Sequence, residues 1–289
     1  MPHISVIVST YNKPAFLEQV LRGYAIQTDS DFELVIADDG SGPETAALIG
    51  RTRAETRLNL LHVWHEDRGF RKTEILNRAI VASSGDYLIF TDGDCIPRRD
   101  LVAVHRSLAQ AGRYVAGGYL KLPAEVCASI TMDTIMSGDV ADLRWLRNHG
   151  WKPGRRALRL GRWKRLSAFW DRVTPTKADF QGNNASTWRD AIIAVNGFEG
   201  EMGYGGLDQA FGFRLQNAGI RGIQARHRAI AMHLYHDRPY RDPAIVRRNR
   251  QIMARIRRSG ESRARRGIAE LGPDPTLRID GSVVWQQQA

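Results

Sequence analysis

The chain has 289 residues, which is enough for one large α/β domain or two modest ones. Hydrophobic residues make up 43% of the chain and charged residues 25%, a composition that excludes wholesale disorder. Two cysteines, Cys95 and Cys127, are too few for a disulfide framework, so we expect a reduced, cytoplasmic protein. No apolar run approaches the roughly 18 residues of a membrane span. Residues 1–10 show no basic leader of a signal peptide.

The formal net charge is +11, and the excess of basic residues lies in two segments. Residues 144–172 contain ten lysines and arginines and one acid, and residues 247–266 contain nine arginines and one acid. The rest of the chain contains 23 basic and 29 acidic residues, so it is mildly acidic. This pattern predicts a polyanionic partner, such as a phospholipid surface, a phosphorylated glycan or a nucleic acid.

The first basic segment also contains five large aromatic side chains, Trp145, Trp151, Trp163, Phe169 and Trp170. Tryptophan among arginines is typical of a segment that lies at the headgroup level of a membrane. The alternative is a solvated helical face whose tryptophans pack on the protein body. The sequence has no zinc finger, RNA-binding aromatic signature or P-loop, so no nucleic acid is expected. The two basic segments are therefore candidates for contact with the anionic inner face of the cell membrane, and the solvated helical face remains open beside it.

Strand and helix patterns alternate over the first 120 residues. Short apolar runs predict buried strands at residues 4–8, 32–37, 58–64 and 86–91. Apolar residues at helical spacing predict a helix that starts near Pro14 and is capped by Asn12, and a second helix over residues 73–82. This alternation predicts a Rossmann-like, mostly parallel sheet with helices on both faces.

Polar clusters follow three of these strands directly, at residues 10–12, 38–41 and 92–94. Parallel sheets bind ligands outside the carboxyl ends of their strands. We therefore expect all three clusters to face one crevice.

The second half of the chain is less regular. We expect a helical excursion at residues 144–172 and loops at 180–188 and 196–206. A helix is predicted over residues 207–218, with Gly219 as its stop signal. The remaining predictions are a short strand and turn at residues 227–236, a helix at 244–256, and weakly ordered chain beyond it.

A candidate metal site lies at Asp92-Gly93-Asp94, behind an apolar strand. Two carboxylates one residue apart can reach a hard cation such as Mg²⁺ or Mn²⁺, which proteins commonly hold with carboxylates and substrate phosphates. His233 or His236 could supply a further ligand, although a lone histidine is more often structural.

Several motifs together resemble glycosyltransferase family 2, which has the GT-A fold. They are ISVIVSTYNKPAFLEQVLRGYAIQ, FELVIADDGS, the strand that ends in Asp-x-Asp, GNNASTWRDAIIAVNGFEGEMGYGGLDQAFGFRLQNAG and HLYH. The last two resemble the chondroitin-polymerase-like and galactosyltransferase-like members. The resemblance covers residues 3–240. It implies a GT-A domain over 1–240, with a nucleotide-sugar half (1–120) and an acceptor half (121–240), followed by an Arg-rich, helical extension (241–289).

The resemblance implies a hexosyl- or N-acetylhexosaminyltransferase that moves a sugar from a nucleotide donor, usually a UDP-sugar, with inversion. The implied donor-binding residues are Thr10, Tyr11, Asn12, Asp38, Asp39, Arg68, Arg71, Asp92 and Gly93, with Lys72 as a further neighbour. Among these, Asp39 matches the uracil contact, Arg71 the diphosphate contact and Asp92 the ribose contact. The implied ligands of Mn²⁺ or Mg²⁺ are Asp94 and a late histidine, with His236 favoured over His233.

An inverting displacement needs a carboxylate that accepts the proton of the acceptor hydroxyl. Asp208 matches the family's base, but Leu207 stands where a Glu is common. The alternative for Asp208 is a helix-start residue stabilised by the helix dipole. Glu199 and Glu201 are reserve candidates.

The resemblance implies an acceptor wall of Asn183, Asn184, Trp188 and Tyr204, against a surface glycan, glycolipid or polysaccharide precursor of bacterial type. Packing explains Trp188 equally well. Two other functions remain open from the residues: a nucleotidyltransferase that makes sugar nucleotides, and a non-enzymatic binder of anionic polymers.

Overall fold

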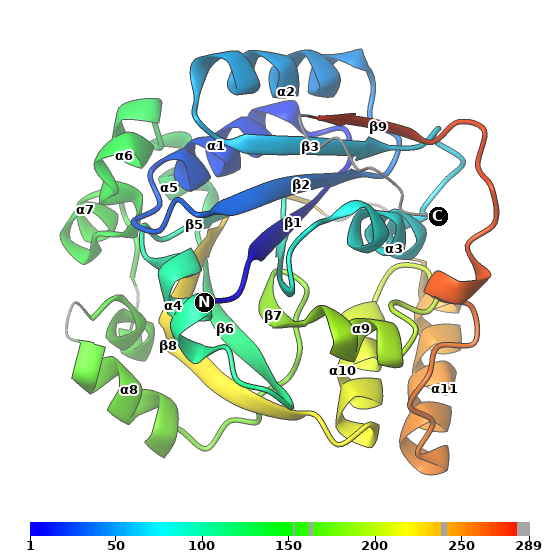
Figure 1. Cartoon of the computed structure of the whole chain (residues 1–289). Helices are drawn as coiled ribbons and strands as arrows, with labels where there is room; N and C mark the ends of the chain where they lie inside the picture. The colour runs from blue at the N-terminus through cyan, green and yellow to red at the C-terminus, as the bar shows by residue number, and fades with distance from the viewer. Residues whose placement is uncertain (153, 162–163, 238–241, 282–289) are drawn as a thin grey trace.

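The computed structural model describes residues 1–152, 154–161, 164–237 and 242–281. Within these residues, nine strands form one sheet in the order β5-β8-β6-β7-β4-β1-β2-β3-β9. Its parallel centre consists of β1 (Ile4–Thr10), β2 (Phe32–Asp38), β3 (Asn59–Trp64) and β4 (Tyr87–Asp92). The α/β class and the parallel centre predicted from the sequence are confirmed (Figure 1).

The other strands are β5 (Cys95–Pro97), β6 (Arg113–Lys121), β7 (Asn184–Trp188), β8 (Arg221–His233) and β9 (Arg278–Gly281). In the described sheet, β6 and β8 run in the direction of the parallel centre, whereas β5, β7 and β9 run against it. The sheet is therefore mostly parallel, as predicted.

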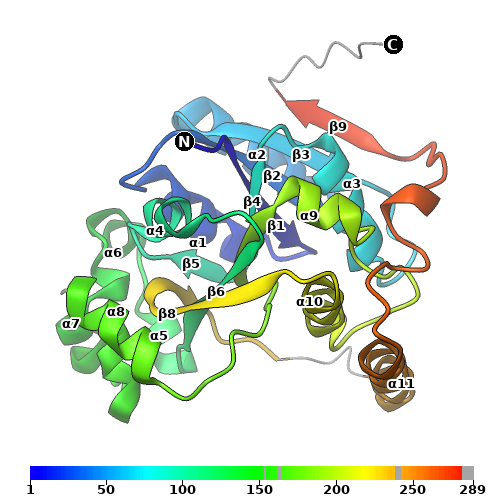
Figure 2. The same ribbon diagram turned by 60° about the horizontal axis from the view of Figure 1, so that its bottom comes forward.

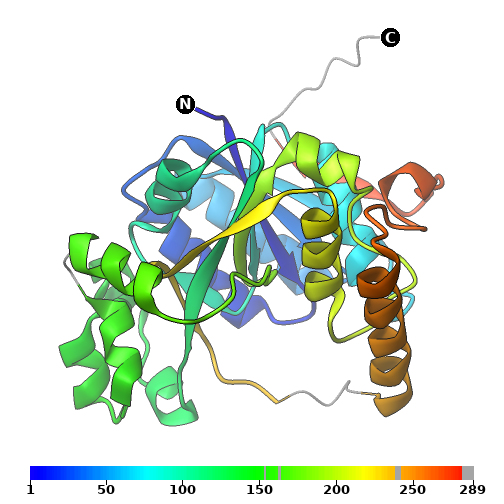
Figure 3. The ribbon, with the colours of Figure 1, turned by 90° about the horizontal axis from the view of Figure 1, so that it is seen from below.

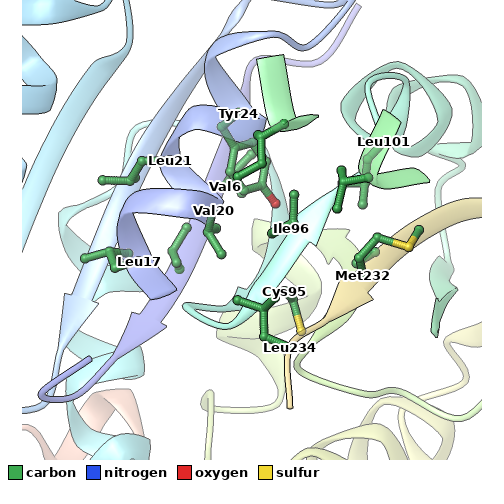
Figure 4. Close-up of a cluster of buried hydrophobic side chains, with 14 of the residues drawn as sticks. Val6, Leu17, Val20, Leu21, Tyr24, Cys95, Ile96, Leu101, Met232 and Leu234 are labelled. Carbon is green, nitrogen blue, oxygen red and sulfur yellow. The ribbon is translucent and has the colours of Figure 1, made fainter. Parts of the chain in front are cut away.

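Helices cover both faces of the sheet (Figure 2). They are α1 (Pro14–Ala25), α2 (Pro43–Glu55) and α4 (Leu101–Leu108) on one face, and α3 (Lys72–Ala82), α9 (Arg189–Ala194) and α10 (Leu207–Asn217) on the other. Side chains alternate along a strand, so β1 sends Val6 to the first layer and Ile7 to the second. In the first layer, Leu17 and Tyr24 of α1 pack in one cluster with Ile96 of β5 (Figure 4).

Two local features of this half differ from expectation. The sequence patterns did not predict α2, whose buried face mixes threonines with Leu48 and Ile49. Asn12 does not cap α1, because Lys13 holds the N-cap position and the φ angle of Asn12 is 46°. Its side-chain oxygen accepts instead from the backbone N–H of Gly42, at 2.9 Å, and so ties the loop after β1 to the loop after β2.

Part of the predicted loop 180–188 is strand β7, which lies between β4 and β6. The strand was missed because its buried residues are polar rather than apolar. Ser186 lies 2.7 Å from both the Tyr87 hydroxyl and Nδ1 of His105, and Oδ1 of Asn184 accepts from Nε2 of His105 at 2.9 Å. Partners from distant elements thus satisfy these polar groups inside the sheet.

Residues 124–173 form a group of short helices at one flank of the molecule, on the left of Figure 1. They are α5 (Ala124–Ala128), α6 (Met132–Ser137), α7 (Leu143–Asn148) and α8 (Lys164–Val173), with 3₁₀ turns at Asp139–Ala141 and Gly154–Leu160. Trp145 stacks on His149, with ring centroids 4.0 Å apart, and Trp151 is buried. Trp163 lies outside the described residues. No described helix is long and apolar enough to cross a membrane.

The C-terminal residues belong to the same body. The predicted helix is present as α11 (Pro243–Ser259), which is capped by Asp242 and packs on α10. The chain then passes over α9 and α3, through a 3₁₀ turn at Ile268–Glu270, and ends with β9 on the edge of β3. The expectation of weakly ordered chain after residue 256 is therefore wrong for the residues up to Gly281. Residues 282–289 lie outside the described part.

The contact between this tail and the body predicts the stability effect of one substitution. Both carboxylate oxygens of the buried Glu199 accept backbone N–H groups, from Arg265 at 2.9 Å and Arg266 at 3.1 Å. Glutamine keeps only one acceptor oxygen, so Glu199→Gln leaves one of the two backbone N–H groups without its acceptor. We therefore expect a loss of about 1–3 kcal/mol in the free energy of unfolding. Urea denaturation measures it, with Glu201→Gln in the same loop as control. Equal stability of the two variants would contradict the assignment.

Candidate active site

A cavity of about 730 Å³ opens at the carboxyl ends of β1, β2 and β4, within the range of small-molecule sites. The described residues that line it include Thr10, Tyr11, Asp39, Lys72, Asp92, Gly93, Asp94, Asn183, Tyr204, Leu207, Asp208, His233 and His236. All three polar strand ends that the sequence placed at one crevice contribute to this list. The expected crevice is confirmed.

Asp94 lies beside two histidines because the pairing of β5 with β8 sets Cys95 opposite His233. Nε2 of His236 is 2.9 Å from Oδ2 of Asp94, and Nε2 of His233 is 4.0 Å from Oδ1. Burial acts to raise the pKa of Asp94, but the hydrogen bond with His236 and the two imidazoles lower it to about 2. The same hydrogen bond raises the pKa of His236. The site therefore holds an ionised carboxylate.

This group of side chains suits a divalent cation. Asp94, Cys95 and His233 offer ligand atoms within 4.8 Å of one another. Burial and the nearby Asp94 raise the pKa of the Cys95 thiol, so it stays protonated and is a poor ligand. Carboxylate oxygen and imidazole nitrogen remain, and both suit Mn²⁺. The residues that would hold the ion are Asp94 and one or both histidines.

Asp92 and Lys72 form an ion pair in the same cavity. Oδ1 of Asp92 accepts from the Ser9 hydroxyl at 2.7 Å and from Nζ of Lys72 at 2.6 Å. Burial acts to lower the pKa of Lys72, but the carboxylates of Asp92, Asp208 and Asp94 outweigh it and raise that pKa. Lys72 is therefore a permanent cation among three carboxylates.

Asp208 lies in the first turn of α10, after two glycines with φ angles of 102° and 84° at positions 205 and 206. Its Oδ1 is buried and has no hydrogen-bond partner in the described structure. Burial raises the pKa of Asp208 to about 6, with a further increase from Asp92 and an opposing effect of Lys72. A Cβ atom on Gly182 would lie 2.4 Å from Oδ1, so only glycine leaves room for this carboxylate.

Leu207 stands where the resemblance to glycosyltransferase family 2 would lead one to expect a glutamate, and its surroundings in the structure are apolar on one side. Leu207 is 5% exposed and belongs to the hydrophobic cluster between α10 and the sheet, while also lining the cavity. An apolar side chain here lowers the polarity around the adjacent Asp208.

Four of the expected donor-binding residues do not line the described cavity. One is Asn12, whose side chain is hydrogen-bonded to Gly42 instead. Two others are Asp38 and Arg68. Asp38 is completely buried, 2.9 Å from Nε2 of His62, and accepts from the N–H of Ser41. Arg68 is exposed and pairs with Glu66 at 2.9 Å. These two assignments were wrong because the side chains are already used by the protein's own hydrogen bonds and ion pairs.

Arg71 is the fourth. It lines a separate hollow of about 180 Å³, and its Nη1 lies 3.3 Å from Glu74 and 3.6 Å from Asp274. Its backbone N–H donates to Asp39 at 3.0 Å, and Asp39, which lines the cavity, also contacts His65 at 2.8 Å. Lys72 and Lys13, not Arg71, are the basic side chains that line the described cavity.

A second group of ligand-type side chains lies beside Arg71. His65, Glu74 and Asp274 offer atoms within 4.8 Å of one another. Arg71 already places positive charge against the two acids, so this group does not need a cation for charge balance.

On the expected acceptor side, Asn183 and Tyr204 line the cavity, and the Tyr204 ring packs edge-on against Phe70. Asn184 is buried in the β7 network and donates to the carbonyls of Gly118 and Ala229. Trp188 packs on Tyr87 and donates to the Gln110 carbonyl. Asn184 and Trp188 are therefore structural, which corrects their assignment.

The two reserve bases also lie outside the cavity. Glu199 binds the tail, and Glu201 is absent from the described lining residues. Of the described carboxylates that line the cavity, Asp208 is the one that a helix, α10, carries rather than a strand end.

Sequence analysis missed Asn249, which holds the loop before Asp208. The buried amide group of Asn249, on α11, donates to three successive carbonyls, those of Gly203, Tyr204 and Gly205, at 2.9, 3.2 and 2.7 Å. No sequence signal marks this residue, because it stands within an Arg-rich helix.

The chain is similar to known glycosyltransferases in sequence and in fold. Residues 5–125 match the family described as "Glycosyl transferase family 2". Validoxylamine A glucosyltransferase of Streptomyces hygroscopicus subsp. jinggangensis is 36% identical over 94 residues, which are 32% of this chain and 22% of that protein. Hyaluronan synthase of Pasteurella multocida is 30% identical over 95 residues, 32% of this chain and 10% of that protein. The match thus spans about a fifth or less of these relatives.

Solved structures share the fold over most of the chain. S. aureus TarS 1–349 in complex with UDP-GlcNAc superposes with a TM-score of 0.58 at 14% identity, over 87% of this chain and 65% of that one. The mannosyltransferase PcManGT from Pyrobaculum calidifontis, in complex with GDP-Man and Mn²⁺, superposes with a TM-score of 0.55 at 22% identity, over 83% of this chain and 59% of that one. These findings favour a transferase over a nucleotidyltransferase or a non-enzymatic binder. Residues 5–125 of the chain thus match glycosyltransferase family 2, and the chain has the GT-A fold of these solved structures.

Proposed function

We propose that this protein is a metal-dependent, inverting glycosyltransferase. It moves a sugar from a nucleotide-sugar, with a UDP-sugar as the expected donor, to a hydroxyl of a bacterial-type surface glycan, glycolipid or polysaccharide precursor. One observation carries the proposal: a single cavity contains the Asp94–His236 pair and the buried, partner-free oxygen of Asp208.

The strand-end side of the cavity suits the donor. Thr10, Tyr11 and Asp39 offer polar groups to a nucleoside, and Lys72 offers a fixed positive charge to a diphosphate. A divalent cation at Asp94 and His236 would add charge where the leaving diphosphate becomes more negative. The neighbours solved with UDP-GlcNAc and with GDP-Man and Mn²⁺ support this kind of donor and ion.

Asp208 suits the role of general base. Its pKa of about 6 leaves the carboxylate mostly ionised at neutral pH, yet basic enough to accept a proton as the acceptor hydroxyl attacks. No side chain of the described residues bonds to its Oδ1, and the backbone N–H of Gly182 helps to keep the carboxylate ionised. Inversion in one displacement requires no covalent intermediate, so no further nucleophile is needed.

The metal assignment predicts the effect of Asp94→Asn. The substitution removes an anionic ligand, so Mn²⁺-dependent binding of UDP should be lost and transfer abolished. Isothermal titration calorimetry with UDP, with and without Mn²⁺, measures the loss. Asp274→Asn, in the second ligand-type group, is the control and should bind like the parent protein. Retention of Mn²⁺-dependent binding in Asp94→Asn would exclude this site.

The base assignment predicts a separation of binding from turnover in Asp208→Asn. The amide keeps the shape but accepts no proton, so kcat should fall by roughly 10²–10⁴ while UDP affinity stays near the parental value. Asp190→Asn is the control, since Asp190 also lies in the first turn of a helix but outside the cavity. A kcat for Asp208→Asn above about a tenth of the parental value would be inconsistent with general-base catalysis.

The ionisation of Asp208 also predicts a pH profile. The active form is the carboxylate, so kcat should fall as the pH drops through about 6, the pKa of Asp208. Lys72 lowers that pKa, so Lys72→Met should move the acid limb to higher pH, whereas Lys72→Arg should leave it near the parental position. Initial rates across pH give the limb even where Lys72→Met reduces the maximum rate. An acid limb that stays in place in Lys72→Met would show that another group controls it.

A further inference from the structure

Helix α8 presents apolar side chains to solvent. Leu166, Phe169 and Val173 are 47%, 53% and 46% exposed. Their spacing of three and four residues places them on one stripe of the helix. A surface helix of a globular protein ordinarily turns such a stripe toward the core.

The opposite face of α8 is polar and buried. Ser167 and Asp171, one turn apart, are 4% and 6% exposed. Oδ2 of Asp171 accepts from Nε of Arg228 at 2.6 Å, and Oδ1 accepts from the N–H of His227 at 2.8 Å. Both partners belong to β8, so an ion pair and hydrogen bonds hold α8 with its apolar stripe outward.

The segment that contains the stripe, residues 144–172, is positively charged. Asp171 is the one acid in the segment 144–172, and it is buried and paired, so no acid is exposed in that segment. The exposed charged side chains described there are all basic: Arg144, Arg147, Lys152, Arg155, Arg156 and Arg172.

We propose that α8 docks on an anionic lipid surface, with Leu166, Phe169 and Val173 inserted between headgroups and the surrounding arginines against lipid phosphates. A short helix with an apolar stripe and flanking basic residues has the physical form of an interfacial membrane anchor. Three exposed apolar side chains on one ten-residue helix are few for a stable protein interface, which buries about 800 Å² per partner.

The proposal concerns this flank alone. α11, which carries the second basic segment, lies on the opposite side of the sheet from α8 (Figures 1 and 3). Among the described residues, α11 also turns Ile252 and Ile256 inward and exposes no large apolar side chain. The outward apolar stripe thus distinguishes α8 from an ordinary basic helix.

Co-sedimentation of the full chain with lipid vesicles tests the proposal. We expect binding to vesicles of mixed phosphatidylglycerol and phosphatidylcholine, and little binding to pure phosphatidylcholine. Leu166→Ser/Phe169→Ser/Val173→Ser should lower the partition coefficient by at least about tenfold, because the inserted apolar groups are lost. Arg155→Gln/Arg156→Gln should lower it by about fivefold for each residue.

The matched control is Val81→Ser/Ile193→Ser, which removes exposed apolar side chains elsewhere, 56% and 44% exposed, and should bind like the parent. Circular dichroism checks that every variant folds, and the arginine variant tests the surface without changing the stripe. Absence of vesicle binding, equal binding to neutral vesicles, or parental binding by a folded stripe variant would overturn the proposal. The stripe could instead be covered by a second copy of the chain, and sedimentation velocity tests for this. A dimer of the parent protein that the stripe variant abolishes would also overturn the proposal.

Discussion

The ammonium group of Lys72 lies among three carboxylates, and the chemistry of the cavity depends on this arrangement. Nζ of Lys72 donates to Asp92 at 2.6 Å. Burial raises the pKa of Asp208, and the positive charge of Lys72 lowers it, which limits the increase. Like charges brought together in a buried site need such a counter-charge, because an uncompensated carboxylate takes up a proton instead. The same cation that balances the strand-end acids therefore keeps Asp208 within a useful range for accepting a proton.

The fold brings these groups together from distant parts of the chain. Parallel strands end on one edge, which collects Thr10, Asp39 and Asp92. β5 then turns back against β8 and carries Asp94 to the late histidines. On the other side, α11 fixes the loop before Asp208 through the amide of Asn249. The Arg-rich C-terminal helix thus supports the active-site wall.

Sequence patterns predicted the parallel half well, because its strands are apolar runs and its functional groups follow them directly. They failed at β7, whose buried polar residues find partners such as His105 only in the folded state. They also failed to separate Arg71 from Lys72, since adjacent residues at a helix start point about 100° apart and only the packing decides which one faces the cavity. Asp38 and Asn184 resemble ligand-binding residues in sequence but are used by the protein's own hydrogen bonds.

We infer that one cavity binds a nucleoside diphosphate and a divalent cation at Asp94, with Asp208 in the same cavity. A crystal structure with UDP and Mn²⁺, recorded at a wavelength where manganese scatters anomalously, would test this arrangement. We expect an anomalous peak within coordination distance of Asp94 and a late histidine, with uracil beside Asp39 and the Asp208 carboxylate free of the metal. A peak at His65, Glu74 and Asp274, or UDP bound outside the cavity, would contradict it.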